Sequence, residues 1–306
     1  MRVRLLGTAA GGGFPQWNCR CAVCEKARQN PPQALPRTQS SVAVSANGAD
    51  WFLLNASPDI RHQIEAFPEL LPPAGTTRGS ALQGVLVTNA DLDHSLGLFI
   101  LREGKPLDVY APPAVREALA EGLNLSHVLS AYSGLRWHDP PHELEPLLNS
   151  NGSPSGLLFQ SFGVPGKMPR YYADRPTPQG DQAVGYRLVD GKTRGRMVFI
   201  PDIARFDETA LSQMRDCDLL LLDGTFWSEN EMRESGTGTL TASQMAHIVV
   251  GGPQGSLAQI KSLSVKQKIY LHINNTNPIL VEGSAEQMVV KAAGVEVGRD
   301  GMELVL

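Results

Sequence analysis

Long hydrophobic runs and runs of basic residues are both absent from this 306-residue sequence. No apolar stretch approaches the ~20 residues that a membrane-spanning helix needs, so we expect a soluble protein without a membrane partner. The net charge is −4 at pH 7 and the lysines and arginines are dispersed, which argues against nucleic acid as a partner. Residues 1–7 form a short apolar run that breaks into a glycine-rich stretch, which is typical of a strand entering a loop rather than of a signal peptide, and we therefore expect a cytoplasmic protein.

Cysteine is scarce, and three of the four cysteines are crowded together at Cys19, Cys21 and Cys24. This distribution excludes the bridged framework of a small secreted domain. Three thiolates so close together in a reducing compartment favour a structural zinc ion, against the alternative of reactive or merely buried cysteines. Cys217 precedes an apolar run, and we interpret it as an inert core residue.

Short apolar runs recur along the whole chain, and most are bounded by Gly, Pro, Asn or Asp, which favours strands over helices. The expected strands are 3–6, 42–44, 51–54, 84–88, 108–111, 157–162, 185–189, 197–200, 219–222 and 269–273. A helix is expected over residues 113–122, and Thr241 and Gln244 have the spacing of a capping box that opens another helix.

The early part of the chain has more strands than crossover helices, which predicts an α/β fold with mixed sheets in two layers and helices outside them. One domain over residues 1–306 is expected, because layered folds of this size often share one core. Residues 139–156 and 163–182 are expected to be long loops, which usually cover a substrate or move.

Three predicted strands end on residues that can bind a metal ion. The strand at 84–88 continues into Asn89-x-Asp91-x-Asp93-His94, the strand at 197–200 is followed by Asp202, and the strand at 269–273 carries His272. Taken singly, each has an ordinary explanation, because Asp and Asn stabilise turns, Asp202 could cap a helix and His272 could be a half-buried histidine. Their joint occurrence favours a metal site at one rim of a sheet.

The order of these motifs resembles the metallo-β-lactamase superfamily pattern His-x-His-x-Asp-His, then Asp, then His, with the first two histidines replaced by Asn89 and Asp91. Four segments resemble more specifically the PqqB family of pyrroloquinoline quinone (PQQ) biosynthesis. They are 6–24 (LGTAAGGGFPQWNCRCAVC), 55–61 (NASPDIR), 88–97 (TNADLDHSLG) and 271–278 (LHINNTNP). The resemblance covers nearly the whole chain and implies the four-layer αββα fold, with two mixed sheets between helices.

The replaced histidines change the expected metal content. A two-metal hydrolase holds its first ion with those two histidines and a third that lies between the Asp-His pair and the later Asp, and no histidine occurs between His142 and His247. Three other histidines could stand in, although they cluster in an expected helix end and loop: His127, His138 and His142. We therefore expect one ion. Its predicted ligands are Asp93, His94, Asp202 and His272.

The predicted ligand set has two imidazoles and two carboxylates, which approaches the arrangement of non-haem Fe(II) oxygenases with positions open for substrate and O₂. It lacks the paired ions of hydrolytic sites, so redox chemistry is favoured. Asp91 is expected among the catalytic residues, and both Asp91 and Asn89 are expected to hydrogen-bond water or a ligating group. The same ligands also accept Mn(II), Cu(II) or Zn(II).

The resemblance to the PqqB family implies an Fe(II)- and O₂-dependent hydroxylase whose substrate is a small-molecule PQQ precursor, the tyrosine-derived ring of a cross-linked Glu-Tyr compound. Two alternatives stay open at this point. One is a non-catalytic carrier that helps to transport PQQ or its precursor, and the other is a hydrolase that retains one metal ion.

The zinc ion expected at the cysteines needs a fourth ligand. In superfamily members with this cysteine trio, that ligand is a histidine three residues after the active-site histidine, and here the position is Asn275. Asn275, a distant His or Cys, or a group from the second subunit of a homodimer are the alternatives.

Several further residues have ordinary structural explanations. We interpret His247 as a packed helical residue rather than as a ligand. Turn stabilisation is expected for Ser57 and Asp59, and surface packing for Tyr171 and Tyr172, with substrate contact as the alternative for both pairs. The glycine-rich stretch 8–13 is followed by a proline and the cysteines, not by a helix, so no dinucleotide site is expected.

Overall fold

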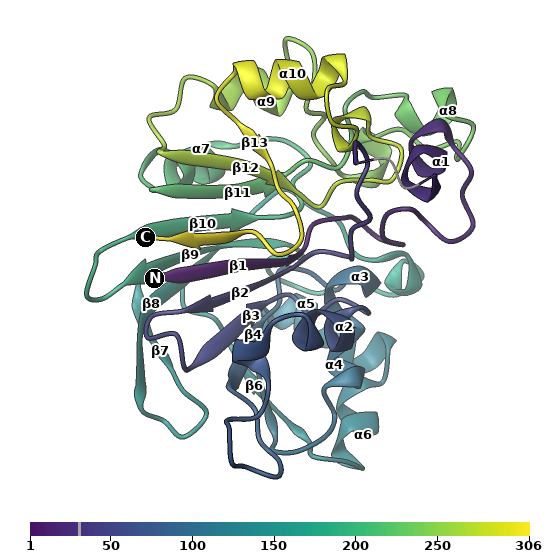
Figure 1. Cartoon of the computed structure of the whole chain (residues 1–306). Helices are drawn as coiled ribbons and strands as arrows, with labels where there is room; N and C mark the ends of the chain where they lie inside the picture. Colours follow the sequence, from purple (N-terminus) through teal and green to yellow (C-terminus); the bar gives the residue numbers. More distant parts are fainter. Residues whose placement is uncertain (30–31) are drawn as a thin grey trace.

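A computed structural model describes all residues of the chain except 30 and 31. In the described residues, fourteen strands form two seven-stranded sheets, in the orders β14-β1-β2-β3-β4-β5-β6 and β13-β12-β11-β10-β9-β8-β7 (Figure 1). The first sheet contains β1 (Arg2–Gly7), β2 (Ser41–Ser45), β3 (Trp51–Leu54), β4 (Leu82–Leu86), β5 (Leu107–Tyr110), β6 (Leu135–His138) and β14 (Glu303–Val305). The second contains β7 (Glu145–Leu148), β8 (Pro154–Gly163), β9 (Val184–Asp190), β10 (Arg196–Ile200), β11 (Leu219–Asp223), β12 (Gln267–Leu271) and β13 (Glu296–Val297).

Both sheets are mixed, as the sequence predicts. Strands β3 to β6 run parallel to one another, and so do β10 to β13, whereas β1, β2, β7, β8 and β9 pair antiparallel. The side chains of β11 alternate between two cores, because Leu219 and Leu221 face the other sheet while Leu220 and Leu222 face the outer helices. Burial on both faces explains why this strand is an unbroken apolar run.

Helices cover the outer face of each sheet and complete the four-layer αββα arrangement (Figure 1). The helices on the side of the first sheet are α2 (Ile60–Glu65), α3 (Leu92–Ser95), α4 (Gly97–Ile100), α5 (Pro113–Glu117) and α6 (Leu125–Ser130). Those on the side of the second sheet are α1 (Ala22–Arg28), α7 (Glu208–Arg215), α8 (Glu231–Glu234), α9 (Ser256–Ile260) and α10 (Ala285–Ala292). Among the described helices, none is both long and apolar enough to span a bilayer.

The inner core lies between the sheets and joins them. Buried side chains of both sheets pack together there, including Phe52 from β3 and Leu188 from β9. The Tyr186 hydroxyl on β9 donates to the carbonyl oxygen of Val87, just after β4, at 3.0 Å. This contact fixes the end of β4 against the second sheet, directly before the Asn89-x-Asp91-x-Asp93-His94 motif.

Two local predictions need correction. The expected loop at 139–156 contains β7 and the start of β8, which pair with each other. The loop expected at 163–182 is present as residues 164–183 between β8 and β9, with a single 3₁₀ turn at Arg170–Tyr172. The helix expected at 113–122 is confirmed as α5 followed by a π-helical turn, Ala118–Gly122.

Candidate active site

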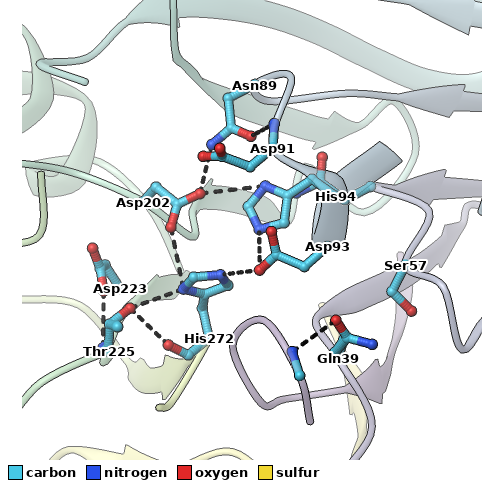
Figure 2. A network of polar contacts seen from close by, with 12 residues as sticks. Gln39, Ser57, Asn89, Asp91, Asp93, His94, Asp202, Asp223, Thr225 and His272 are labelled. Atoms are coloured by element: carbon cyan, nitrogen blue, oxygen red, sulfur yellow. Dashed lines mark hydrogen bonds and ion pairs between the residues drawn. The ribbon is translucent and has the colours of Figure 1, made fainter. Parts of the chain in front are cut away.

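Residues from both sheets meet where the parallel strands end. Asp93 and His94 lie on α3 just after β4 of the first sheet, whereas Asp202 follows β10 and His272 follows β12 of the second sheet. The sequence predicted one rim of a sheet, and the structure shows a rim shared by two. Figure 2 shows Asp202 and His272 facing Asp93 and His94 across this junction.

The four side chains lie close together, with His272 between Asp93 and Asp202 (Figure 2). The Nε2 and Nδ1 atoms of His272 lie 3.0 Å from Asp93 Oδ2 and 3.1 Å from Asp202 Oδ1. His94 Nδ1 lies 3.3 Å from Asp202 Oδ2, and His94 Nε2 lies 4.0 Å from Asp93 Oδ2. Ligand atoms of Asp93, His94 and His272 all lie within 4.8 Å of one another, a spacing that one metal ion can bridge.

Two buried atoms of this cluster lack a hydrogen-bond partner among the described residues. They are His94 Nε2 and Asp202 Oδ1, and the 3.1 Å approach of His272 Nδ1 to Asp202 Oδ1 is an ion-pair contact that does not form a hydrogen bond. A buried polar atom without a partner is costly, and the His94 ring is fully buried. A cation between the two sheets would satisfy both atoms, so the donor set fits a bound metal ion.

The backbone holds each histidine in place. The His94 carbonyl accepts a hydrogen bond from Ala56 N at 2.9 Å, and Gly97 N donates to the Ala56 carbonyl at 2.9 Å. A side chain at Gly97 would collide with the Ser57 carbonyl at 2.4 Å, so only glycine permits this close approach of α3 and α4. His272 leaves β12 with a left-handed φ of 54°, which turns its ring toward the cluster.

Polar neighbours orient the cluster. Asn89 Nδ2 donates to Asp202 Oδ2 at 2.6 Å, and the hydroxyls of Thr88 and Thr225 lie 3.2 Å and 2.8 Å from the Nδ1 atoms of His94 and His272. Asn89 therefore supports the Asp202 carboxylate from a position where the superfamily pattern has a histidine. Hydrogen bonds of this kind fix the ligands of metal sites.

The buried charges shift one another's pKa values. Burial raises the pKa of Asp91 to about 7, and the carboxylates of Asp93 and Asp202 contribute to this rise. For Asp93, burial acts to raise the pKa, but the nearby rings of His94 and His272 lower it by more. The pKa of Asp93 is therefore below its usual value. For His272, burial acts to lower the pKa, but the carboxylates of Asp202 and Asp93 have the larger effect. The pKa of His272 is therefore raised to about 10. The cluster is thus rich in negative charge, which favours a cation.

His247 also belongs to this cluster, and interpreting it as a packed helical residue was wrong. Its ring stacks on that of His272 with a centroid separation of 5.6 Å, and its ligand atom lies within 4.8 Å of those of Asp202 and His272. The expected capping box is present at Thr241 and Gln244, but the 3₁₀ turn Ser243–Met245 ends at Ala246. Ala246 has a left-handed φ of 65°, which stops the helix and swings His247 toward the cluster.

A carboxylate holds His247. Asp223, the last residue of β11, is fully buried and lies 2.9 Å from His247 Nδ1. Asp223 Oδ2 also accepts from Ile203 N at 3.0 Å, which connects it to the segment that carries Asp202. Asp223 follows the apolar strand predicted at 219–222, so the pattern that identified Asp202 would have found it too.

Other candidate residues lie away from the ligand atoms. His138 on β6 pairs with Asp108 at 2.7 Å, His127 lies in α6, and no potential ligand group among the described residues includes either of them or His142. Ser57 is fully buried and bonds to Gln63, and Asp59 accepts from Gln39, so both stabilise the local backbone.

The two tyrosines differ in their contacts. The Tyr171 hydroxyl donates to the Ala90 carbonyl at 2.6 Å, inside the Asn89-x-Asp91 motif, whereas Tyr172 donates to Glu117 at 2.8 Å. Tyr171 therefore brings the 164–183 loop to the candidate site, and Tyr172 fixes the loop to α5.

The cysteine trio forms a second candidate metal site. The Sγ atoms of Cys19, Cys21 and Cys24 lie within 4.8 Å of one another. Asn275 Nδ2 lies 3.2 Å from the Sγ atoms of Cys19 and Cys24 and 3.8 Å from that of Cys21. The amide of Asn275 thus faces all three thiols, and a rotation of that amide by half a turn would present its oxygen to an ion there. Cys217 is buried with its thiol on the Met214 carbonyl, as a core residue should be.

The comparisons with known proteins agree with this geometry. Residues 50–273 match the beta-lactamase superfamily domain. The chain is 40% identical over 309 aligned positions to coenzyme PQQ synthesis protein B of Klebsiella pneumoniae, with 100% of this chain and 98% of the relative covered. It is 41% identical to the protein of the same name from Ectopseudomonas mendocina, with both chains fully covered.

Solved structures show the same fold. The Zn²⁺-bound PqqB from Methylobacterium extorquens superposes with a TM-score of 0.90 at 38% identity, with 100% of both chains covered. A diphosphatase from the PhnP family superposes with a TM-score of 0.68 at 20% identity, covering 99% of this chain and 97% of the other. The second likeness is one of fold alone.

Proposed function

The chain belongs to the coenzyme PQQ synthesis protein B family of the β-lactamase superfamily, and from this membership we propose that it hydroxylates a PQQ precursor with Fe(II) and O₂. The proposed substrate is a small molecule, the tyrosine-derived ring of a cross-linked Glu-Tyr compound. Asp93, His94, Asp202 and His272 would hold the ion. When bound, Fe(II) supplies the activation of O₂ that ring hydroxylation requires.

The observation that supports a one-ion oxygenase site is the hydrogen bond that the Asn89 side chain forms. Its amide donates to Asp202 Oδ2 at 2.6 Å, so it supports a ligand of the proposed ion rather than offering a histidine to a second one. Paired ions are what hydrolytic sites of this superfamily use to clamp attacking and leaving oxygens. Two imidazoles and two carboxylates around one ion suit redox chemistry better.

The chain's own groups can hold protons near the reacting ring. Burial lowers the pKa of His247, but Asp223 outweighs it, so this pKa is raised and the ring keeps a proton at Nδ1 on Asp223. Asp91 lies in the same motif as the proposed ligand Asp93, two residues before it, and a carboxylate at this position can take up and release a proton beside the ring. His247 and Asp91 are therefore the proposed proton-handling groups.

Oxygen uptake tests this function. Protein reconstituted anaerobically with Fe(II) is mixed with a cross-linked Glu-Tyr diamino acid, O₂ and ascorbate, because inserting one oxygen atom into a ring C–H bond leaves the second atom to be reduced to water by two electrons. We expect O₂ consumption and a product one oxygen atom heavier by mass spectrometry. Zinc-loaded protein is the control and should consume none, since Zn²⁺ has no redox chemistry. Intact iron loading without turnover would exclude the hydroxylase.

A carrier or a one-metal hydrolase is the second candidate, because the proposed ligands also accept Zn²⁺, an ion that the Methylobacterium extorquens relative binds. A redox-inert ion suits binding or hydrolysis. A carrier would bind precursor or PQQ tightly in a metal-dependent way and release it chemically unchanged, which mass spectrometry of the recovered ligand detects. Turnover of a phosphodiester or a β-lactam would instead support a hydrolase.

We also propose that Cys19, Cys21 and Cys24 hold a structural zinc ion with Asn275 as the fourth ligand. The proximity of the Asn275 amide to all three Sγ atoms supports this assignment. A bound zinc would join the segment before α1, and α1 itself through Cys24, to the residues that follow His272.

A further inference from the structure

The 164–183 loop is tied to the candidate active site at three points. Ala204 N, two residues after Asp202, donates to the Pro165 carbonyl at 2.8 Å, and the Tyr171 hydroxyl donates to the Ala90 carbonyl at 2.6 Å. At the far end of the loop, Ala183 forms an antiparallel bridge with Asn89. The stretch between Pro165 and Tyr171 is therefore fixed beside the ligand cluster.

Two cations lie in this fixed stretch, Lys167 and Arg170. The Lys167 ammonium donates to the Gln244 carbonyl at 3.0 Å, so it reaches from the loop to the turn that carries His247. Among the described residues, neither cation forms an ion pair. An ammonium has three N–H donors, and Lys167 uses one of them for its hydrogen bond to the Gln244 carbonyl.

Lys167 lies within electrostatic reach of the cluster. Burial lowers the pKa of Lys167, while the carboxylates of Asp91 and Asp202 raise it and the charge of Arg170 lowers it. Asp202 is engaged by Asn89 and by the two proposed ligand histidines, and so it is not available as a direct partner of the ammonium. In the part of the chain that the structure describes, Lys167 thus lies within the electrostatic influence of Asp91 and Asp202 but forms an ion pair with neither.

We propose that Lys167 forms the carboxylate-binding edge of the active site and selects ligands that carry free carboxylates. This inference rests on the proposed function for the identity of the ligand, because a cross-linked Glu-Tyr diamino acid keeps the carboxylates of both amino acids. Ammonium and guanidinium groups bind carboxylates through charge-assisted hydrogen bonds, which are about twice as strong as neutral ones. A ligand whose carboxylates are esterified would lose this contribution.

The test compares two probes on zinc-loaded protein, which binds without turnover. Isothermal titration calorimetry gives the Kd of the cross-linked Glu-Tyr diamino acid and of its fully methylated ester. For Lys167→Gln we expect the acid to bind roughly 10-fold more weakly and the ester to bind as it does to the unmodified chain. The salt dependence of acid binding should also become shallower, because one ionic contact is gone. Lys167→Arg keeps the charge and should restore most of the affinity.

The control is Lys192→Gln, which removes an exposed lysine from the turn between β9 and β10. It should leave both Kd values unchanged. Melting temperature and metal content verify that each variant is folded and loaded. The inference is overturned by unchanged acid binding in Lys167→Gln, by an equal loss for acid and ester, or by no binding of the acid to the unmodified chain.

This test separates the inference from the proposed function. If acid binding depends on Lys167 but the iron-loaded protein consumes no O₂, the proposed hydroxylase activity is refuted and the carboxylate-binding edge is supported. If the iron-loaded protein consumes O₂ but acid binding does not depend on Lys167, the carboxylate-binding edge is refuted and the hydroxylase is supported.

Discussion

At the scale of single residues, the proposed active-site ion depends on side chains that follow strands of both sheets. We expect Asp202→Ala or His272→Ala to remove the proposed active-site ion and to leave the proposed zinc at the cysteines in place, because the two sites are built from different residues. Elemental analysis of purified protein measures this as a drop of one metal equivalent. Asp139→Ala is the control, since this exposed carboxylate pairs with Arg116 on the protein surface. Retention of both ions in Asp202→Ala and His272→Ala would refute the ligand assignment.

Asn89 makes a second prediction at this scale. Asn89→Ala removes the donor that holds Asp202 Oδ2 at 2.6 Å. Losing such a supporting hydrogen bond typically weakens metal binding about 10- to 100-fold, and we expect a loss in that range. Competition with a chelating dye measures the Kd of the active-site ion. An unchanged Kd would mean that Asn89 does not support the ligand, whatever its role in the fold.

A third residue-scale prediction concerns Glu231 and pH. Burial raises the pKa of Glu231 from 4.5 to about 7, although Thr276 and the Trp227 amide donate to it. Between these pH values the folded protein keeps a proton that the unfolded chain has released, so stability falls as the pH rises from about 4.5 to about 7. The shift is worth up to about 3 kcal/mol.

The neutral variant Glu231→Gln tests this. Its free energy of unfolding in urea should lack the Glu231 contribution, so the difference between Glu231→Gln and the unmodified chain should grow in favour of the variant from pH 5 to pH 8. A difference that stays constant over this range would show that Glu231 titrates normally in the folded protein.

At the scale of elements, the strands that sequence analysis missed share one property. All ten predicted strands are confirmed, and the four that were not predicted, β6, β7, β13 and β14, are the edge strands of the two sheets. An edge strand pairs on one side only and is often half exposed, so it needs no continuous apolar run. Two of the four also have only two or three residues, and β7 contains a proline, which edges tolerate.

The candidate site divides in a similar way. The Asp93-His94 pair, Asp202 and His272 follow apolar strands, so the pattern of apolar runs is enough to mark their positions in the sequence. His247 lies after a left-handed residue in an irregular turn, and its place is set by contacts with Asp223 and His272 that are distant in sequence. No local pattern encodes such contacts.

The cysteine segment gives an element-scale prediction. Cys24→Ser, a change within α1, should abolish zinc binding between the cysteine trio and Asn275. Because a structural zinc contributes directly to folding, the melting temperature should fall by about 5 °C or more. Differential scanning calorimetry and zinc analysis measure the two effects. Cys217→Ser is the control, because it alters a buried core thiol and should keep its zinc. Full zinc content in Cys24→Ser would contradict the assignment.

At the scale of the whole molecule, the proposed active-site ion joins the two sheets. Asp93 and His94 come from the first sheet and Asp202 and His272 from the second, while the inner core packs the same sheets together further along the strands. Without an ion, the facing carboxylates of Asp93 and Asp202 repel each other, and buried atoms of His94 and Asp202 find no hydrogen-bond partner among the described residues. Binding an ion should therefore stabilise the entire fold and not the site alone.

This stabilisation can be measured. For protein whose cysteine site is filled and whose active site is empty, adding Zn²⁺ should raise the free energy of unfolding by about 2.7 kcal/mol at a free ion concentration of 100 Kd. His272→Ala serves as the matched variant, because it should keep the cysteine zinc and show no further gain from added ion. Amide hydrogen exchange should slow in strands of both sheets, since the ligands come from both. Slower exchange confined to the second sheet would show that Asp93 and His94 do not share the ion. The proposal that the ion joins the two sheets would then be wrong.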